Sequence, residues 1–260
     1  MTQPIKALIL DMDGVLWRDD DWLIEPGRTF GRIRSVGLQV ALATNNATRT
    51  PAHYLAKFAA KGVELETWQV VTSAVAAADF LRAQYPAGGA VFVVGETGLE
   101  EALVSRGFQI GGPDPLAVVS GLDRQVTYDK LKLASFLVRR GVPFIGTNPD
   151  LSFPTPEGLT PGAGAIQAAI TAATGIAPLI IGKPQSTMYQ QVLARMGAAP
   201  GETLVIGDRL DTDILGAQRL GCRTGLVLSG VTTAEQAAAW TPQPNFIAPN
   251  LEQLLDQVIP

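Results

Sequence analysis

Short, uninterrupted apolar runs recur along this chain, and each ends in a polar or glycine-containing cluster. Runs of this length without alternation are typical of strands buried on both faces, as in a parallel sheet. They cover residues 7–10 before Asp11, 40–43 before Thr44, 179–181 before Gly182, 204–206 before Gly207 and 225–228 before Ser229. The pattern therefore predicts a core of parallel strands.

Helical periodicity separates several of these runs. Segment 51–61 places apolar residues three and four positions apart, and Gly62 follows as a stop signal. Segment 186–196 has the same spacing and ends before Gly197. Strands that alternate with helices in this way predict a doubly wound α/β fold, in which a Rossmann-like parallel sheet has helices on both faces.

The middle third of the chain repeats the alternation on its own. Apolar runs predict strands there at 91–94, 117–119 and 143–145, and helical spacing predicts helices at 127–140 and 164–174. We therefore expect a second α/β domain inserted into the first. The predicted boundaries are 1–82 and 178–260 for the core and 83–177 for the inserted domain.

Composition excludes several classes of protein. Of the 260 residues 47% are hydrophobic and 17% charged, which is enough apolar surface for a large buried core. The formal net charge is -4 and no cluster of Lys and Arg occurs, so nucleic acids and anionic membranes are not expected as partners. The single Cys222 excludes an internal disulfide. Lys6 interrupts the first apolar segment, unlike a signal peptide, so we expect a cytoplasmic protein.

Four of the predicted core strands end in residues that can carry chemistry: Asp11, Thr44, Lys183 and Asp208. In an open parallel sheet the ligand crevice lies beyond the carboxyl ends of the strands. If these strands are neighbours, the four side chains converge on one pocket.

Asp11 and Asp13 lie two residues apart at the first strand end, and Gly14 permits a tight turn after them. Two carboxylates this close suit a nucleophile paired with an acid/base. Taken alone, the segment also matches an ordinary acidic turn. Trp17 follows closely, and both core packing and a place in the pocket wall remain open for it.

Three more carboxylates, of Asp208, Asp211 and Asp213, come after the strand at 204–206. Like charges ~4 Å apart repel by ~4 kcal/mol at an effective dielectric near 20, so a cation must offset their crowding. Oxygen ligands without His or Cys favour Mg²⁺. We expect Asp208 and Asp213 at the site, because Asp211 can equally face solvent or begin the next helix.

Phosphate ligands are predicted at two other strand ends. Thr44, Asn45 and Asn46 supply a hydroxyl, two amides and backbone N–H groups, although the same residues also form ordinary turns. Lys183 precedes Pro184, which favours an extended backbone at that position. A lysine there can neutralise a phosphate and a carboxylate; a lysine that faces solvent is the alternative.

These segments, in this order, resemble the haloacid dehalogenase superfamily of phosphatases, and in detail its NagD-like subclass IIA. The shared pattern is Asp-x-Asp-Gly, a Thr or Ser at a strand end, a Lys, and Gly-Asp followed by another Asp. Members of this subclass carry a large α/β cap between the second and third motifs, where the inserted domain is predicted here. The resemblance spans nearly the whole chain and includes Asn148-Pro149-Asp150.

The resemblance implies roles for the matching residues. Asp11 would attack phosphorus and form an aspartyl-phosphate, and Asp13 would protonate the leaving group and then activate water. Mg²⁺ would bind Asp11, Asp208 and the backbone carbonyl of Asp13, with Asp213 in support. The phosphate would be held by Thr44, Asn45, Asn46 and Lys183.

The expected activity is therefore that of a Mg²⁺-dependent phosphohydrolase acting on a small phosphate ester, such as a sugar phosphate or a nucleoside monophosphate. A homodimer formed through the cap would fit the family. Two alternatives stay open: a phosphosugar- or nucleotide-binding module that does not turn over, and phosphoryl transfer to an acceptor other than water.

Overall fold

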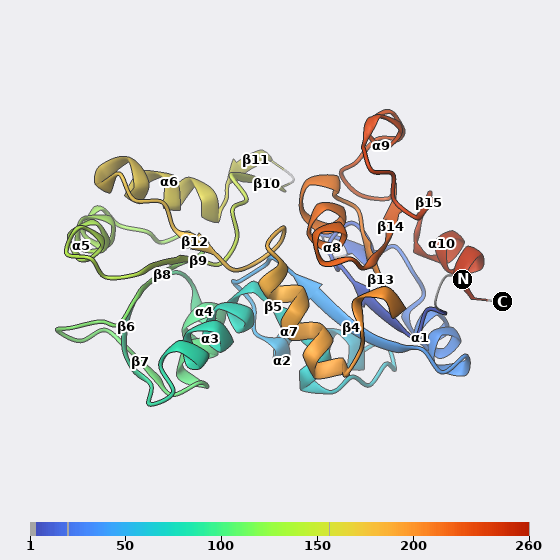
Figure 1. The fold of residues 1–260 in the computed structure, drawn as a ribbon, viewed down its shortest axis with the longest axis horizontal. Coiled ribbons are helices and arrows are strands. Elements are labelled where there is room, and N and C mark those ends of the chain that lie inside the picture. Colours follow the sequence, from blue (N-terminus) through green and yellow to red (C-terminus); the bar gives the residue numbers. More distant parts are fainter. Residues whose placement is uncertain (1–3, 20, 156, 260) are drawn as a thin grey trace. The chain divides into compact units, whose positions relative to one another are not determined.

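A computed structural model describes residues 4–19, 21–155 and 157–259 and divides the chain into two compact units. The first unit comprises the chain up to Thr44, Pro51–Val71, and the chain from Lys183 onward. The second comprises Asn45–Thr50 and Thr72–Gly182. Each unit has its own parallel sheet, so the predicted α/β fold is confirmed (Figure 1).

The first unit contains a six-stranded sheet with β1 and β13 at its centre. In spatial order the strands are β15 (Phe246–Ala248), β14 (Arg223–Val227), β13 (Thr203–Gly207), β1 (Ala7–Leu10), β4 (Gln39–Thr44) and β5 (Val70–Thr72). β1 pairs in parallel with both neighbours, so that Ile9 lies opposite Val205 on one side and Ala41 on the other. All four residues of β1 are buried, as expected for a strand covered on both faces.

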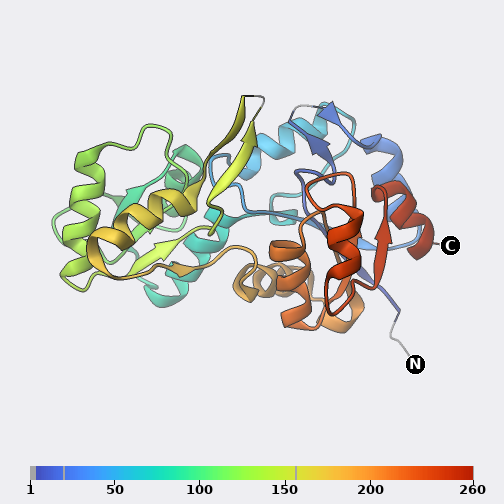
Figure 2. The ribbon, with the colours of Figure 1, turned by 90° about the horizontal axis from the view of Figure 1, so that it is seen from above.

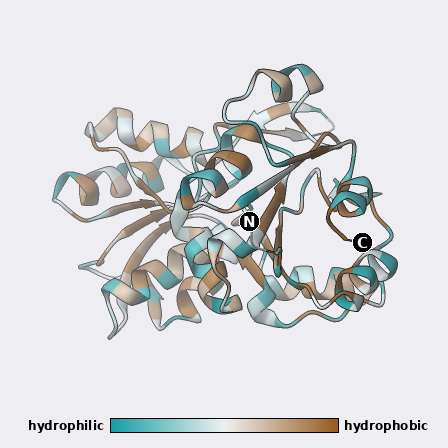
Figure 3. Cartoon of the chain, turned by 45° about the vertical axis from the view of Figure 1, so that its right-hand side comes forward, coloured by the Kyte–Doolittle hydropathy of each residue, from teal (hydrophilic) through white to brown (hydrophobic). Residues whose placement is uncertain are grey.

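Helices cover both faces of this sheet. They are α1 (Pro26–Ser35), α2 (Pro51–Ala59), α7 (Ser186–Met196), α8 (Leu215–Leu220), α9 (Ala234–Ala239) and α10 (Leu251–Val258), with short turns η1 (Thr67–Gln69), η2 (Pro200–Glu202) and η3 (Leu210–Ile214). Alternate strand residues such as Leu8 and Leu42 pack with Phe30, Phe58 and Leu254 of α1, α2 and α10. Because successive side chains of a strand point to opposite faces, half of the apolar side chains of each strand lie on each face of the sheet. Figure 3 shows the strands of both sheets as predominantly hydrophobic.

A small hairpin follows the first acidic segment. Its strands are β2 (Trp17–Arg18) and β3 (Asp21–Trp22), and Trp17 lies opposite Trp22. Both tryptophans pack against the core cluster that contains Phe30 and Phe58. The hairpin therefore ties the loop after β1 to the core.

The second unit is a three-layer structure around a five-stranded parallel sheet. The strands, in spatial order, are β12 (Leu179–Ile180), β9 (Phe144–Gly146), β8 (Val118–Ser120), β6 (Gly89–Val94) and β7 (Phe108–Ile110). One face is covered by α3 (Ser73–Gln84) and α4 (Thr97–Val104), and the other by α5 (Tyr128–Arg139) and α6 (Ala163–Thr174) (Figure 1). An antiparallel hairpin of β10 (Ser152–Thr155) and β11 (Gly158–Pro161) stands apart from the sheet (Figure 2).

One predicted core strand was assigned to the wrong sheet. The run 179–181 was expected in the core, but β12 pairs in parallel with β9, with Leu179 opposite Ile145. β12 is the edge strand of this sheet, and because Leu179 is half exposed it is not a strand buried on both faces. An apolar run alone cannot tell which of two sheets it joins.

The compact units also differ in extent from the predicted domains. The second unit begins at Thr72, where 83 was expected, ends at Gly182, where 177 was expected, and includes Asn45–Thr50. Helix α3 accounts for the first difference because it packs against α4. No helix among the described residues is long and apolar enough to cross a lipid bilayer.

Candidate active site

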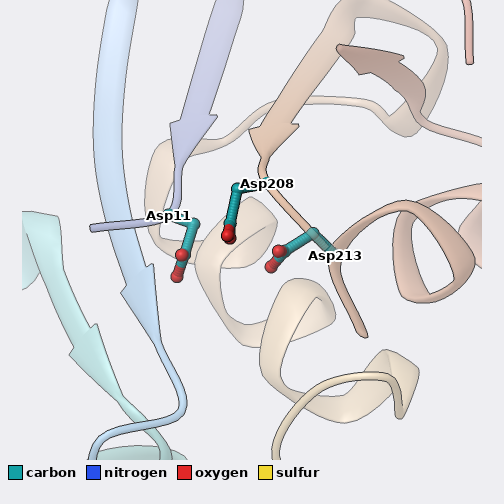
Figure 4. A group of neighbouring side chains, drawn as sticks. All are labelled: Asp11, Asp208 and Asp213. Carbon is teal, nitrogen blue, oxygen red and sulfur yellow. The ribbon is translucent and has the colours of Figure 1, made fainter. Parts of the chain in front are cut away.

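Two neighbouring strands of the first sheet bring Asp11 and Asp208 together. Leu10 lies opposite Ile206 in the parallel pairing of β1 with β13, and the next residues leave the sheet at the same edge. The Asp11 N–H donates to the Ile206 carbonyl at 2.8 Å, which extends the ladder to the acidic residue itself. Carboxylate oxygens of Asp11, Asp208 and Asp213 all lie within 4.8 Å of one another, and Figure 4 shows the three groups around a common space.

Asp213 comes from the widened turn η3 and not from a strand. The N–H groups of Asp213 and Ile214 both donate to the Arg209 carbonyl, at 3.1 and 3.2 Å. Such π-type turns are frequent at functional sites. The turn directs Asp213, which is 1% exposed, into the acidic group, whereas Asp211 is exposed and pairs with the Arg209 guanidinium at 3.0 Å.

Lys183 joins two of the acids. Its Nζ lies 2.5 Å from Asp11 Oδ1 and 2.6 Å from Asp213 Oδ1, and it donates to the Ala43 carbonyl at 3.1 Å. Burial opposes the charge of this ammonium, but Asp11 and Asp213 outweigh burial and raise the pKa of Lys183 well above its ordinary value. Lys183 is therefore a buried cation at this site and not the solvent-facing lysine of the alternative interpretation.

The carboxylates outnumber this single cation. Burial raises the pKa of Asp11 well above its ordinary value, with Lys183 acting against it and the other acids adding to it. Burial and the charge of Asp213 raise the pKa of Asp208 to about 7, although the Val231 N–H donates to Asp208 Oδ2 at 2.7 Å. The cluster thus carries an excess of negative charge, and a divalent cation would favour the ionised forms of these acids.

The arrangement of acceptor oxygens fits a hard cation. Both oxygens of Asp213 accept hydrogen bonds, from Lys183 and from the Arg209 N–H at 3.1 Å. By contrast, Asp11 Oδ2 and Asp208 Oδ1 accept none from residues 4–19, 21–155 or 157–259. Carboxylate oxygens without protein donors suit Mg²⁺, which prefers oxygen ligands and retains several waters. Asp11 and Asp208 therefore fit as ligands, with Asp213 fixed beside them.

Two glycines enclose Asp208: Gly14, which belongs to the Asp-x-Asp-Gly pattern of the sequence, and Gly230, which the sequence did not reveal as part of the site. A Cβ on Gly230 would lie 1.9 Å from Asp208 Oδ2, and one on Gly14, whose φ is +81°, would lie 2.6 Å from it. Ser229 donates its hydroxyl to the Gly14 carbonyl at 2.7 Å and so connects the two loops. The only signal was that Gly230 closely follows the apolar run 225–228.

Asp13 and Thr44 lie at the same sheet edge with different environments. Asp13 is open to solvent, and its Oδ1 accepts a hydrogen bond from the Trp17 indole N–H at 2.9 Å. The protein groups close around this carboxyl displace part of its hydration and raise its pKa, with the Trp17 hydrogen bond acting against the rise. Thr44 is 2% exposed, ends β4 and follows Ala43, whose carbonyl binds Lys183.

Asn45 and Asn46 belong to the second unit. The Asn45 carbonyl accepts hydrogen bonds from Ser73 Oγ at 2.5 Å and Asn148 Nδ2 at 2.8 Å, and its side-chain amide donates to Asp150 Oδ2 at 3.2 Å. Asn46 Oδ1 accepts from the N–H and the hydroxyl of Thr48, at 2.9 and 2.8 Å. Asn46 thus forms an ordinary turn, the alternative role for this segment, and phosphate binding by both asparagines stays a prediction.

A parallel sheet in which Asp11 and Asp208 follow adjacent strands, beside the buried Lys183 and Asp213, is typical of an α/β enzyme whose active site is built from carboxylates. Comparison with known proteins agrees with this class. A model of the haloacid dehalogenase-like hydrolases matches residues 8–109, and a HAD-hydrolase-like model matches 180–254. The acid sugar phosphatase of Staphylococcus aureus is 35% identical over 254 residues, which cover 97% of this chain and 98% of that protein.

Solved structures show the same relationship. NagD from Escherichia coli K-12 superposes with a TM-score of 0.88 at 35% identity, over 95% of this chain and 97% of that one. The glycerol phosphate phosphatase of Mycobacterium tuberculosis, in complex with magnesium, superposes with a TM-score of 0.87 at 32% identity, over 97% of this chain and 77% of that one. The chain belongs to the haloacid dehalogenase superfamily and is a phosphatase of its NagD-like subclass IIA.

Proposed function

We propose that this phosphatase hydrolyses small phosphorylated metabolites in a Mg²⁺-dependent reaction that passes through an aspartyl-phosphate on Asp11. The observation that carries the proposal is the position of Asp11 between a buried ammonium, Lys183 at 2.5 Å, and a second carboxylate, Asp208, that keeps an oxygen without a protein donor. Lys183 and a bound cation would oppose the effect of burial on the Asp11 pKa, so that the nucleophile is ionised as well as oriented.

In the first half of the reaction an oxygen of Asp11 attacks phosphorus in line with the leaving group. The bond from phosphorus to the ester oxygen breaks, and that oxygen takes a proton from the Asp13 carboxyl and departs as an alcohol. Lys183 balances the charge of the phosphoryl oxygens and keeps Asp11 oriented through its bond to Oδ1. The raised pKa of Asp13 favours the protonated form that this step requires.

In the second half Asp13, now a carboxylate, accepts a proton from water while the water oxygen attacks phosphorus. The bond between phosphorus and the Asp11 oxygen breaks, inorganic phosphate leaves, and both carboxyl groups return to their starting states. One residue thus serves as acid and then as base, so two carboxyl groups suffice for both halves of the reaction.

Asp11 and Asp208 would hold the Mg²⁺ with the backbone carbonyl of Asp13, and Asp213 would support them through Lys183 and the Arg209 N–H. When bound, Mg²⁺ supplies positive charge that offsets the crowded carboxylates and the phosphate. The magnesium in the related glycerol phosphate phosphatase supports this assignment. Positioning and charge together must supply most of a rate enhancement that for phosphate monoesters reaches ~10²¹-fold.

The proposed substrate class is the small phosphate ester. The relatives are named for acid sugar phosphatase and glycerol phosphate phosphatase activities, which supports sugar and polyol phosphates as the first compounds to examine. We propose that the second unit serves as the cap that selects among them, and that Thr44, Asn45 and Asn46 contribute to holding the phosphate.

A panel of phosphorylated metabolites, assayed for phosphate release with Mg²⁺ and with a chelator, tests the proposal. We expect release from at least one sugar or polyol phosphate with Mg²⁺, and a loss of about 100-fold or more with the chelator. Metal-independent release would contradict the Mg²⁺ assignment. Binding without release would favour the non-catalytic module, and a phosphorylated second alcohol among the products would indicate transfer to an acceptor other than water.

A further inference from the structure

Trp17 has a fixed orientation in an aromatic cage of the first unit. Its ring stacks on Tyr54, with centroids 6.0 Å apart and planes at 12°, and meets Trp22 edge-on at 5.1 Å. Phe58 packs on it at 5.8 Å, and Trp17 is only 2% exposed. Close packing on several sides leaves an indole one rotamer, so the direction of its N–H is set by the core.

That N–H points at the proposed acid/base. Trp17 Nε1 donates to Asp13 Oδ1 at 2.9 Å, while the backbone of the same residue accepts from the Gly14 N–H at 2.7 Å. Trp17 therefore binds both the Asp13 side chain and the backbone of Gly14, the next residue. A carboxyl that is open to solvent would otherwise turn about its side-chain torsions, and ordering it costs free energy.

A cation lies over the same indole. Lys57 Nζ is 4.2 Å from the centroid of the Trp17 ring and 5.6 Å from that of Trp22. Positive charge on the face of an aromatic ring is attracted by its electrons and draws them away from the ring edge. The N–H at that edge becomes a stronger donor to a carboxyl oxygen.

We propose that Trp17 is a positioning residue for Asp13, and that its N–H reserves Oδ1 as an acceptor so that Oδ2 carries the proton given to the leaving group. An oxygen that accepts an N–H hydrogen bond is the carbonyl oxygen of a neutral acid, and the proton then resides on the other oxygen. This inference rests on the acid/base role proposed for Asp13. It explains why a tryptophan buried in the core has its one polar atom at the edge of the active site.

The test replaces Trp17 with Phe, which keeps most of the ring and removes the N–H. Trp22→Phe is the matched control, because Trp22 belongs to the same cage. Two substrates are compared: glycerol phosphate, whose alkoxide needs a proton to leave, and p-nitrophenyl phosphate, whose phenolate does not. General acid catalysis contributes about 10²–10⁴-fold, so loss of its alignment should cost on the order of ten- to a hundred-fold in kcat.

We expect Trp17→Phe to lower kcat for glycerol phosphate by that factor, with KM and the single-turnover rate of nitrophenolate release from p-nitrophenyl phosphate changed less than about threefold. Trp22→Phe should leave the ratio of the two rates unchanged. Equal losses on both substrates, or the same behaviour in both variants, would overturn the inference. Lys57→Met, which keeps the indole N–H, should show the same selectivity to a smaller degree and provides the test if Trp17→Phe unfolds.

Asp13→Asn separates this inference from the function on which it rests. In the Asp13→Asn background, Trp17→Phe should have no further effect on glycerol phosphate, because the group that it positions is gone. Full activity of Asp13→Asn would remove the acid/base assignment itself. An inactive Asp13→Asn variant beside a fully active Trp17→Phe variant would overturn only the role of Trp17.

Discussion

The two sheets of this protein have the same architecture but carry different side chains at the carboxyl ends of their strands. Both are parallel, and in both one side chain spans neighbouring chain segments at the carboxyl edge. In the second unit Gln167 donates to the Ser120 and Asn148 carbonyls at 3.2 and 3.1 Å. In the first unit Lys183 takes that place and binds Asp11 and Asp213.

The two edges differ in the net charge that remains around the bridging side chain. Gln167 is buried and neutral, and its amide satisfies backbone carbonyls, so nothing further is required there. Lys183 is one cation among several buried acids, and the remaining negative charge favours binding of a metal ion. Two sheets with the same architecture can thus differ in chemistry, because the charged side chains at the strand ends, and not the fold, determine what the site can bind.

The strongest way to break the comparison is to remove the nucleophile. We expect Asp11→Asn to lower kcat by about 10⁴-fold or more, because an amide does not attack phosphorus at a useful rate. Steady-state phosphate release measures the loss. Asp211→Asn is the matched control, since Asp211 is exposed and pairs only with Arg209 among the contacts described, and it should retain activity within about twofold. Near-normal activity of Asp11→Asn would refute the assignment.

The second largest effect is expected from substitution of a glycine that encloses Asp208. A Cβ on Gly230 would lie 1.9 Å from Asp208 Oδ2, so Gly230→Ala must displace that carboxylate or its loop. We expect the Mg²⁺ concentration for half-maximal activity to rise by about 10- to 100-fold, the range typical when a metal ligand loses its support. Gly37→Ala is a control without steric contact, although its φ of +74° adds backbone strain. An unchanged Mg²⁺ requirement in Gly230→Ala would exclude this role for the loop.

The crowded acids also predict a pH dependence of stability in the metal-free protein. The pKa of Asp208 is about 7 in the folded protein and near its ordinary value of 3.8 when unfolded. Between these values the folded state binds more protons than the unfolded state, so the free energy of unfolding falls as pH rises, by at most about 1.4 kcal/mol per pH unit for this group.

Urea unfolding from pH 4.5 to 7.5, with a chelator and with Mg²⁺, measures this dependence. We expect Mg²⁺ to reduce the decline, because it favours the ionised carboxylates, and Asp208→Asn to weaken the decline without metal. A metal-free protein whose stability rises steadily to pH 7.5 would contradict the crowding of charge described here.

Substitutions at the neutral edge of the second sheet should lower the free energy of unfolding and leave kcat nearly unchanged. Gln167→Leu removes a hydrogen bond from each of two backbone carbonyls, although the Ser120 carbonyl still accepts from the Thr147 N–H at 2.8 Å. The variant should cost about 1–3 kcal/mol of unfolding free energy, with kcat within about threefold. Ser120→Ala should cost less than about 0.5 kcal/mol, because Ser120 Oγ is buried and has no hydrogen-bond partner among the described residues. A large loss of kcat in either variant would show that the second edge does take part in the chemistry.

The sequence predicted the parts of the site that depend on strand order. Asp11, Thr44 and Asp208 follow apolar runs that are neighbouring strands, so their meeting at one edge could be expected before any coordinates. The same reasoning failed for the run 179–181, because hydrophobicity does not record which sheet an edge strand joins. Lys183 reaches the site nonetheless, as the first residue of the returning core segment.

Contacts made by small or backbone groups could not be predicted in this way. The approach of Gly230 to Asp208 and the bond from the Val231 N–H depend on the path of a loop that has no periodic pattern. The indole of Trp17 left two interpretations open because it is both packed in the core and bonded to Asp13. Strands β5 and β15, with three residues each, are too short to give a periodic signal.

Trapping the covalent intermediate tests the central claim most directly. The Asp13→Asn variant, given p-nitrophenyl phosphate and Mg²⁺, should release nitrophenolate once and then stall, since no group remains to activate water. Acid quenching, borohydride reduction and peptide mass spectrometry should then reveal homoserine at position 11, absent in Asp11→Asn and without substrate. Release of nitrophenolate with no modification at position 11, or with modification of a different residue, would contradict the assignment of Asp11 as the nucleophile.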